Sequence, residues 1–319
     1  MPYALQRPRL HYERTGRGEP LLCITGFTIS SAIYEPVLPL WSARFDCITY
    51  DNRGSGRSGT PLRTTSMAEL AADAARLLDA LDVPSAHVFG ISMGGMIAQE
   101  LALRFPERVR GLLLAGTTPG GPRAARPAVR ELAAAGAGLV ATGRRAGRPW
   151  LAPLLFSEAF RAEQPERVRE LLTHFAAHGP TAWGANAHWW ATVYHDTVGR
   201  LGQIQAPTLV LHGGEDRFAP LANARLLARR IPDAELAVIP GTGHAFILEQ
   251  PEASWAVMTE WLDRRAPIAP GRPRSGWAVR REPVTRALGL PIGALRTGGS
   301  LAALATRNRF ESFQPRSRR

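Results

Sequence analysis

The chain has 319 residues, of which 45% are hydrophobic and 21% are charged, a composition typical of a folded globular protein. All 39 basic residues are arginine, because the sequence contains no lysine. This excludes chemistry that needs a lysine ammonium group, such as Schiff-base formation, lysine-anchored pyridoxal phosphate and a Walker-type phosphate loop. The two cysteines, Cys23 and Cys47, lie in short apolar runs, so we expect them to be buried in the core rather than disulfide-bonded.

The net charge of +12 belongs almost wholly to the C-terminal part of the chain. Residues 264–319 contain 13 arginines, two acidic residues and six prolines, whereas residues 1–263 carry a net charge of only +1. Such a segment buries too little apolar surface to offset the entropy lost on ordering, so a poorly ordered extension is expected. Its charge suits weak contact with an anionic surface. No motif for specific nucleic-acid recognition occurs.

The N-terminal 18 residues are polar and arginine-rich, and they lack the apolar segment of a signal peptide. No apolar run approaches the length of a transmembrane helix. These features favour a cytoplasmic protein. The sequence does not indicate its oligomeric state.

Short apolar runs of strand length alternate with amphipathic helical patterns along the first 263 residues. Strands are expected at residues 21–25, 45–50, 86–91, 109–115, 208–212 and 234–239. Helices are expected at residues 67–81, 93–105, 221–230 and 252–262. This alternation predicts an α/β fold with a mostly parallel sheet that is covered by helices on both faces.

The region from residue 119 to 205 interrupts the alternation. It opens with glycine, proline and arginine and then becomes helical. We interpret it as a helical cap inserted between two strands, which divides the core into residues 1–118 and 206–263. The cap contains tryptophans that we expect both to form a small hydrophobic core and to line an apolar lid over a substrate pocket, since a lid must pack on something. Those expected to contact substrate are Trp183, Trp189 and Trp190.

The pattern Gly90-Ile91-Ser92-Met93-Gly94 follows a predicted strand and opens a predicted helix. Alone the G-x-S-x-G pattern is weak, but this context places Ser92 on a sharp strand-to-helix turn. The hydroxyl would lie near a helix N-terminus, whose amides favour negative charge. Ser92 is therefore a candidate nucleophile, and it needs a base to remove its proton.

A candidate base, His244, lies on a glycine-rich loop after the last predicted strand. A neutral imidazole that accepts a proton on one nitrogen needs an acceptor for the hydrogen on the other. Asp216, which follows the strand ending at His212, can provide that acceptor. The neighbouring Glu215 is an alternative acid.

These motifs resemble those of the α/β-hydrolase superfamily over about residues 3–263. The serine turn, the acid loop of residues 213–216 and the base loop of residues 241–244 occur in the family's order, and residues 51–58 are similar to its D-x-R-G-x-G-x-S loop. The resemblance implies an eight-stranded, mostly parallel sheet, and it favours Asp216 over Glu215 as the acid.

The resemblance also implies an oxyanion hole formed by the backbone N–H groups of Phe27 and Met93. The sequence departs from the family pattern at this point. Thr25 precedes Gly26 here, whereas the family often has a histidine in that position. The backbone donors do not require the side chain of that histidine.

These features predict a serine hydrolase that cleaves a carboxylic ester, lactone or thioester of an apolar or aromatic small molecule through an acyl-enzyme on Ser92. The pattern is most similar to esterase-like, enol-lactonase-like and cofactor-free haloperoxidase-like members of the family. The alternative is a non-hydrolytic acyltransferase, lyase or cyclase of secondary metabolism that uses the same residues. Hydrolysis of a carbon–carbon bond also remains open.

No cofactor and no metal site are predicted. His174 and His178 have the spacing of zinc ligands, but no glutamate occupies the H-E-x-x-H position and no third ligand is evident. His188 and His195 are expected on the polar surface of the cap, and contact with substrate is the alternative, because both lie beside the tryptophans. Glu100 is expected on an exposed helix surface, and the arginines of residues 51–58 are expected to brace their own loop.

Overall fold

The structure is a computed structural model, and it describes residues 3–4, 9–61, 63–128, 133, 149–177 and 179–265. The basic extension expected at 264–319 lies outside the described residues from 266 onward, as does His178. Only its first two residues, Arg264 and Arg265, are described, and they belong to the last helix.

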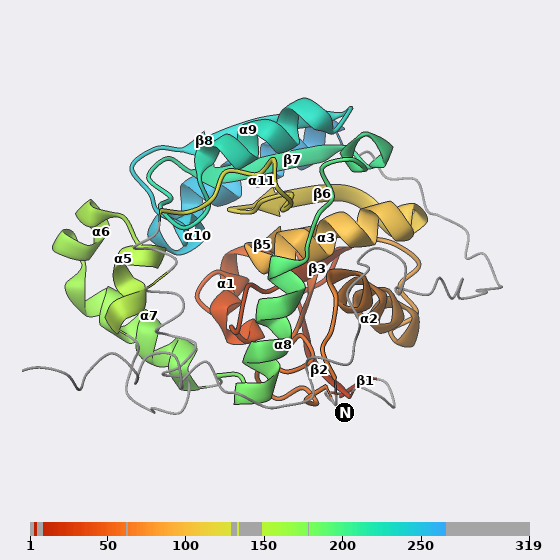
Figure 1. Cartoon of the computed structure of the whole chain (residues 1–319), viewed down its shortest axis with the longest axis horizontal. Helices are drawn as coiled ribbons and strands as arrows, with labels where there is room; N and C mark the ends of the chain where they lie inside the picture. Colours follow the sequence, from red (N-terminus) through yellow and green to blue (C-terminus); the bar gives the residue numbers. More distant parts are fainter. Residues whose placement is uncertain are drawn as a thin grey trace, which may run out of the picture. The chain divides into compact units, whose positions relative to one another are not determined.

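The described strands join in the order β1-β2-β4-β3-β5-β6-β7-β8 (Figure 1). Strands β3 to β8 run parallel to their neighbours, β2 runs antiparallel to β4, and the two-residue β1 pairs only with the outer edge of β2. The expected mostly parallel sheet is therefore confirmed. The strands are β1 (Tyr3–Ala4), β2 (Leu10–Thr15), β3 (Glu19–Ile24), β4 (Phe45–Tyr50), β5 (Ala86–Ile91), β6 (Val109–Ala115), β7 (Thr208–Gly213) and β8 (Ala234–Ile239).

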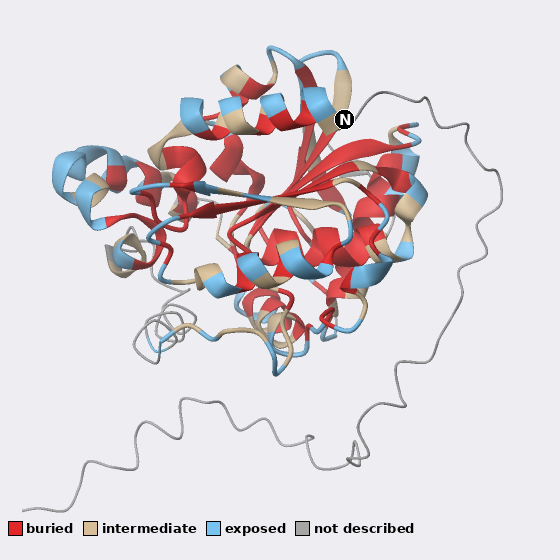
Figure 2. Cartoon of the chain, turned by 90° about the horizontal axis from the view of Figure 1, so that it is seen from above, coloured by how far each residue is buried: buried red, intermediate tan, exposed pale blue. Residues whose placement is uncertain are grey.

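Helices cover both faces of this sheet, whose central strands are buried (Figure 2). Along β3, Leu22 and Ile24 face a core shared with α2, α3 and α9, whereas Leu21 and Cys23 face a second core shared with α1 and α11. This alternation is the two-residue period of a strand that is buried on both sides. The helices are α1 (Leu38–Trp41), α2 (Met67–Ala80), α3 (Met93–Arg104), α5 (Ala152–Leu155), α6 (Glu158–Glu163), α7 (Pro165–Ala177), α8 (Ala182–Val193), α9 (Leu221–Arg230), α10 (Phe246–Glu249) and α11 (Pro251–Arg265), with short 3-10 turns at Ser31–Tyr34, Pro106–Arg108, Pro149–Leu151 and Leu201–Gln203.

Helices α5 to α8 lie between β6 and β7 in the chain, in the region expected to be an insertion. Apolar side chains of α5 and α7 join the core that contains α11, whereas Ala191 of α8 joins the core on the other side of the sheet. The two parts of this insertion therefore pack against different faces of the molecule.

Buried polar contacts with α3 fix both ends of the insertion. Gln99 donates to the carbonyl of Thr118 at 3.1 Å and accepts from the hydroxyl of Thr197 at 2.6 Å. Glu100 pairs with Arg200 and Arg104. Glu100 is buried, so the expectation of an exposed helix charge is wrong. Although burial opposes it, hydrogen bonding to these two arginines holds the pKa of Glu100 below its ordinary value.

Two further expectations concern the core and the membrane. Cys23 and Cys47 are buried and not disulfide-bonded, as predicted. None of the helices in the described ranges is long and apolar enough to cross a membrane.

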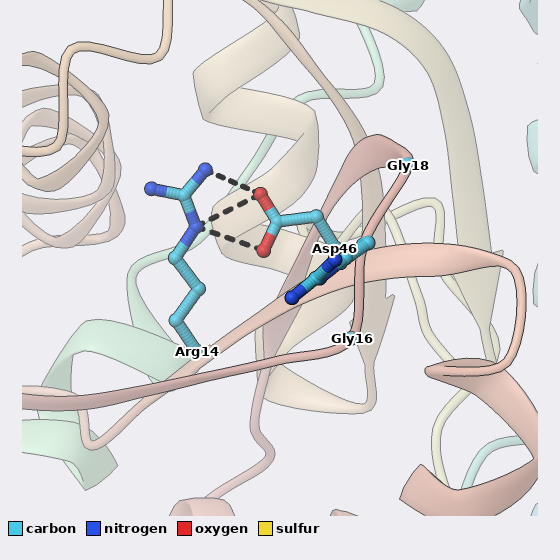
Figure 3. Close-up of a pocket in the computed structure, with 5 residues that line it drawn as sticks. Arg14, Gly16, Gly18 and Asp46 are labelled. Atoms are coloured by element: carbon cyan, nitrogen blue, oxygen red, sulfur yellow. Dashed lines mark hydrogen bonds and ion pairs between the residues drawn. The ribbon is translucent and has the colours of Figure 1, made fainter.

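A cavity of about 470 Å³ lies at the turn between β2 and β3 (Figure 3). Its lining includes the ion pair of Arg14 with Asp46, whose Nε and Oδ1 atoms are 2.8 Å apart, and two glycines of the turn, Gly16 and Gly18. This turn precedes β3, whereas Gly26 follows it. The cavity therefore lies at the amino ends of the parallel strands, at the opposite edge from the motifs described next.

Candidate active site

Ser92 occupies the turn between β5 and α3 with backbone angles of φ 56° and ψ −121°. A positive φ is uncommon for a residue other than glycine, and such strain costs roughly 1–3 kcal/mol. The side chain is only half-buried. An observed strained serine with an accessible hydroxyl at a strand-to-helix turn is the geometry expected of a nucleophile.

The glycines on either side of Ser92 allow this turn to pack closely. A Cβ atom added at Gly90 would lie 2.4 Å from the carbonyl oxygen of Gly94, and one added at Gly94 would lie 2.1 Å from the carbonyl oxygen of Ile24. Both separations are far below van der Waals contact. Helix α3 can therefore cross β3 and β5 at this distance only because these positions have no side chain.

Asp216 and His244 meet at the carboxyl ends of β7 and β8. His244 Nδ1 lies 2.7 Å from Asp216 Oδ2, and both side chains are buried. The second carboxylate oxygen, Oδ1, accepts from the amides of Phe218 and Ala219 at 2.9 and 2.8 Å. With its Nδ1 hydrogen donated to the carboxylate, the imidazole keeps Nε2 unprotonated and able to act as a base. The alternative acid, Glu215, is exposed.

His212 also approaches Asp216, but it is engaged elsewhere. Its Nε2 lies 2.7 Å from the carbonyl oxygen of Ala219 and 3.6 Å from Asp216 Oδ2. Burial lowers the pKa of His212 below its ordinary value. A neutral His212 therefore donates its Nε2 hydrogen to the carbonyl of Ala219, and Asp216 Oδ2 accepts from His244 alone of the two histidines.

The strand end of β6 connects Ser92 to the Asp216–His244 pair. The Ser92 amide donates to Ala115 O at 2.9 Å, and Thr117 Oγ1 donates to Ser92 O at 2.7 Å. Between them, a Cβ added at Gly116 would lie 3.3 Å from the imidazole of His244. Within the described chain, Ser92 Oγ makes no hydrogen bond. Such contacts are often long in the absence of substrate and tighten when substrate binds.

The expected oxyanion donors flank Ser92. A Cβ added at Gly26 would lie 3.2 Å from Ser92 Cβ, so the turn that carries Phe27 packs directly against the serine. Neither the Phe27 amide nor the Met93 amide donates a hydrogen bond to another residue in the described part of the chain. Thr25, at the position where the family often has histidine, is tied by its hydroxyl and carbonyl to Asn52 Nδ2 at 3.1 and 3.2 Å.

Thr28 is a feature of this turn that the sequence did not indicate. Its φ is 57°, and a β-branched residue in this region is strained. Thr28 and Ser92 thus both have a positive φ. They lie on the two segments, the turn after β3 and the turn after β5, that pack together at Gly26. Propensity alone places threonine in extended backbone, so no sequence signal marks this residue.

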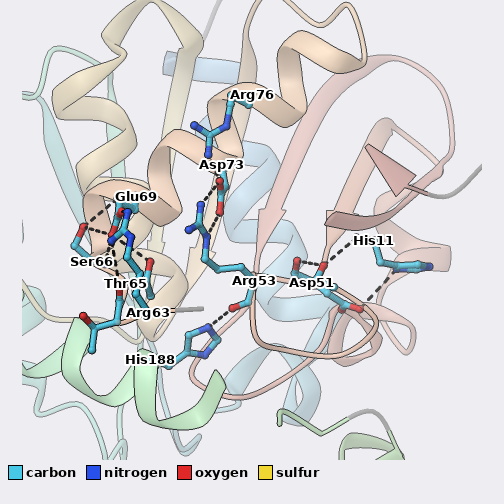
Figure 4. A network of polar contacts seen from close by, with 12 residues as sticks. His11, Asp51, Arg53, Arg63, Thr65, Ser66, Glu69, Asp73, Arg76 and His188 are labelled. Carbon is cyan, nitrogen blue, oxygen red and sulfur yellow. Dashed lines mark hydrogen bonds and ion pairs between the residues drawn. The ribbon is translucent and has the colours of Figure 1, made fainter. Parts of the chain in front are cut away.

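Helix α8 is fixed to the loop of residues 51–58 (Figure 4). His188 Nε2 donates to the carbonyl of Arg53 at 2.7 Å, and the side chain of Arg53 pairs with Asp73 of α2 at 2.6 Å. The arginine braces its loop as expected, but the expected surface positions of His188 and His195 are wrong. Both are buried, and burial lowers the pKa of each to about 4.

The three tryptophans expected to contact substrate lie in different surroundings. Trp189 packs edge-on against Phe27, with ring centroids 6.4 Å apart, and so lies next to the oxyanion turn. Trp183 is 48% exposed, and Trp190 stacks on Tyr194, which is 67% exposed. Of the three, Trp189 is thus the one that a described ring contact places next to the turn beside Ser92.

The sequence profile of the alpha/beta hydrolase fold matches residues 19–251. The chain belongs to the α/β hydrolase family.

Relatives and solved structures agree with this assignment. The hydrolase is 34% identical over 253 residues to a protein of Azorhizobium caulinodans named as a carbamate hydrolase, covering 79% of this chain and 94% of the relative. It is 30% identical over 246 residues to the 3-oxoadipate enol-lactonase 2 of Acinetobacter baylyi, covering 76% and 89%. A thermophilic esterase from Thermogutta terrifontis superimposes with a TM-score of 0.70 at 27% identity, covering 82% and 95%. The expected enzyme of hydrolase type, similar to esterases and enol-lactonases, is thus confirmed.

An aromatic side chain also lies next to the base in this hydrolase. The ring of Phe218 packs edge-on against the imidazole of His244, with ring centroids 5.1 Å apart. The sequence did not indicate this neighbour, although Phe218 follows Asp216 by only two residues.

His174, one of the two histidines with the spacing of zinc ligands, has other partners. Its Nε2 lies 3.0 Å from Ala32 O and 3.1 Å from a carboxylate oxygen of Glu35. Among the described residues, no group of three or more His, Cys, Asp or Glu is placed to hold a metal ion.

Proposed function

We propose that this hydrolase cleaves a carboxylic ester, lactone or thioester through an acyl-enzyme on Ser92. The observation that carries the proposal is the 2.7 Å contact between His244 Nδ1 and Asp216 Oδ2 at the sheet edge where Ser92 follows β5. That contact supplies a base with a fixed tautomer beside a strained, accessible hydroxyl.

In the first half of the reaction, Ser92 Oγ attacks the carbonyl carbon while His244 Nε2 takes the hydroxyl proton. The amides of Phe27 and Met93 hydrogen-bond to the oxyanion that forms. When the intermediate collapses, the bond to the leaving oxygen or sulfur breaks and His244 returns the proton to that atom.

In the second half, His244 takes a proton from water, and the resulting hydroxide attacks the acyl carbon. The bond to Ser92 Oγ then breaks, and the serine recovers the proton from His244. The products are a carboxylic acid and an alcohol or thiol, which remain joined in one molecule when the substrate is a lactone.

Aromatic side chains favour an apolar or aromatic acyl group. Phe27 and Trp189 lie on the oxyanion side of Ser92, and Phe218 lies against His244. Helices α5 to α8 act in this proposal as the cap that covers the acyl group. The names of the enol-lactonase and esterase relatives are consistent with hydrolysis of a lactone or an ester.

The test compares Ser92→Ala with Ser42→Ala on p-nitrophenyl esters of increasing chain length, lactones, acyl thioesters and aryl carbamates. Ser42 is the control because it lies beside Gly16 at the opposite edge of the sheet. We expect Ser92→Ala to lose at least about 10³-fold in kcat and Ser42→Ala to retain wild-type turnover. Retained turnover in pure Ser92→Ala would overturn the proposal.

Hydrolysis is distinguished from transfer or elimination by running the reaction in ¹⁸O-labelled water. We expect one labelled oxygen in the released acid, because water attacks the acyl-enzyme. A product without label would instead support the acyltransferase, lyase or cyclase alternative.

A further inference from the structure

The carboxylate of Glu249, at the end of α10, accepts three hydrogen bonds from two separate parts of the chain. Its Oε1 accepts from the amide of Gly243 at 2.8 Å and from the amide of Ser157 at 3.1 Å. Its Oε2 accepts from the hydroxyl of Ser157 at 2.6 Å. One carboxylate thus joins the loop of the candidate base to the start of α6 in the insertion.

The same contact is reinforced on the other side of His244. The amide of Ala245 donates to the carbonyl of Leu155 at 2.7 Å. A Cβ added at Gly243 would lie 2.8 Å from the amide nitrogen of Ser157 and 2.9 Å from Leu155 O. Both neighbours of His244 in the chain therefore rest against the turn between α5 and α6.

Ser157 connects this turn to its helix. Its hydroxyl accepts from the amide of Phe160 at 3.2 Å and so caps the N-terminus of α6. The hydroxyl that caps the helix also donates to Glu249. A shift of α6 would therefore be transmitted through Ser157 and Glu249 to the backbone next to His244.

The chemical character of Glu249 argues against a simple packing role. No arginine pairs with it in the described part of the chain, and burial raises its pKa above the ordinary value in spite of the three hydrogen bonds. An unpaired, half-buried carboxylate is costly. Two converging amides and a hydroxyl explain its presence, because an ionised carboxylate accepts from all three at once.

We propose that Glu249 is a positioning residue, which holds His244 in register with Ser92 by binding the Gly243 amide to the first turn of α6. The inference rests on the proposed function, since it concerns the base of that reaction. It adds that the insertion is part of the catalytic geometry, because α6 helps to set the position of the histidine.

The test compares Glu249→Ala, Glu249→Gln and Glu249→Asp with the control Glu252→Gln, three residues further on in the exposed first turn of α11. Each variant is titrated with a fluorophosphonate probe, so that kcat is expressed per reactive serine. We expect Glu249→Ala to lose about 10- to 100-fold in kcat, because a displacement of about 1 Å in a catalytic group has an effect of this size. KM should change by less than about threefold, since the residue does not contact substrate.

Glu249→Gln keeps an oxygen acceptor for both amides, so it should recover most of the lost kcat. Glu249→Asp keeps the charge but is one methylene shorter, so it should remain impaired. If Glu249→Ala does not fold, the kcat of Glu249→Asp tests the positioning role instead. Wild-type kcat per titrated site in Glu249→Ala or in Glu249→Asp would overturn the inference, as would a change confined to KM. Failure of the proposed function is seen separately, as a wild-type enzyme that the probe does not label.

Discussion

Asp216 holds His244 by only one of its two oxygens, because Oδ1 is occupied by the amides of Phe218 and Ala219 while Oδ2 faces the imidazole at 2.7 Å. In Asp216→Asn, the side-chain oxygen would keep the position of Oδ1, since both amides there are donors. The amide NH₂ would then face Nδ1 of His244 and favour the tautomer that carries its hydrogen on Nε2. That tautomer cannot accept the serine proton.

We therefore expect Asp216→Asn to retain its fold and to lose about 10³- to 10⁴-fold in kcat, the loss seen when a serine protease is left with the wrong histidine tautomer. Glu215→Gln is the matched control, because this neighbouring carboxylate is exposed. Steady-state kinetics on an aryl ester measure both. Equal activity in the two variants would contradict the assignment of Asp216.

Gly94 lies against the end of β3, where an added Cβ would come within 2.1 Å of Ile24 O. Because backbone atoms on both sides would have to move, Gly94→Ala should lower the free energy of unfolding by about 3 kcal/mol, at the upper end of the usual cost of overpacking. Gly199→Ala is the control, since a Cβ there meets nothing within 4 Å. Its effect should stay within about 0.5 kcal/mol. Urea unfolding of both variants gives the comparison, and similar midpoints would refute the packing argument.

Motifs and apolar runs predicted the parts of the fold in which local sequence and tertiary environment agree. β4, β5, β6, β8 and α9 begin and end at the expected residues, because each is a continuous apolar or amphipathic run bounded by glycine, proline or charge. Strand β2 was not predicted, since Leu10–Thr15 contains charged residues and derives its strand conformation from pairing with β4.

Side-chain environments in the insertion were harder to predict than its helices. His188 and His195 look like surface residues in the sequence, but packing of α8 on the 51–58 loop and closure of the chain near Gly120 bury them. Glu249 likewise follows the base loop as an ordinary acidic residue. Its role depends on Ser157, which is 92 residues away in the chain.

Trp189 and Trp183 provide a matched pair on α8, because one contacts Phe27 and the other is nearly half exposed. Trp189→Ala should lower kcat/KM for aryl or long-chain esters by about tenfold, or roughly 1.4 kcal/mol, as expected for the loss of an aromatic contact. The loss should be smaller for acetyl esters, which reach less of the aromatic surface. Trp183→Ala should leave both values unchanged. A uniform loss across all chain lengths in Trp189→Ala would indicate a general defect rather than a binding contact.

We expect His195 to make the stability of the protein depend on pH. Both of its ring nitrogens lack a hydrogen-bond partner in the described structure, and burial lowers its pKa to about 4 despite the nearby carboxylates of Glu100 and Asp196. In the unfolded chain the pKa returns to about 6.5. Between these two values the unfolded state binds more protons than the folded state, so stability must fall as pH decreases from 6.5 towards 4.

His195→Leu removes this contribution and replaces a buried, unpartnered imidazole with an apolar side chain. Relative to the wild type, the variant should gain about 2 kcal/mol in unfolding free energy between pH 8 and pH 5, from the shift of the single histidine pKa. The variant still contains His188, whose pKa is also about 4. The stability of the variant should therefore still fall as the pH decreases, but with a smaller slope than that of the wild type. Urea unfolding at pH 8, 6 and 5 measures the difference. If the two curves run parallel over this range, the pKa of His195 is the same in the folded and the unfolded chain, and its burial does not control the acid sensitivity.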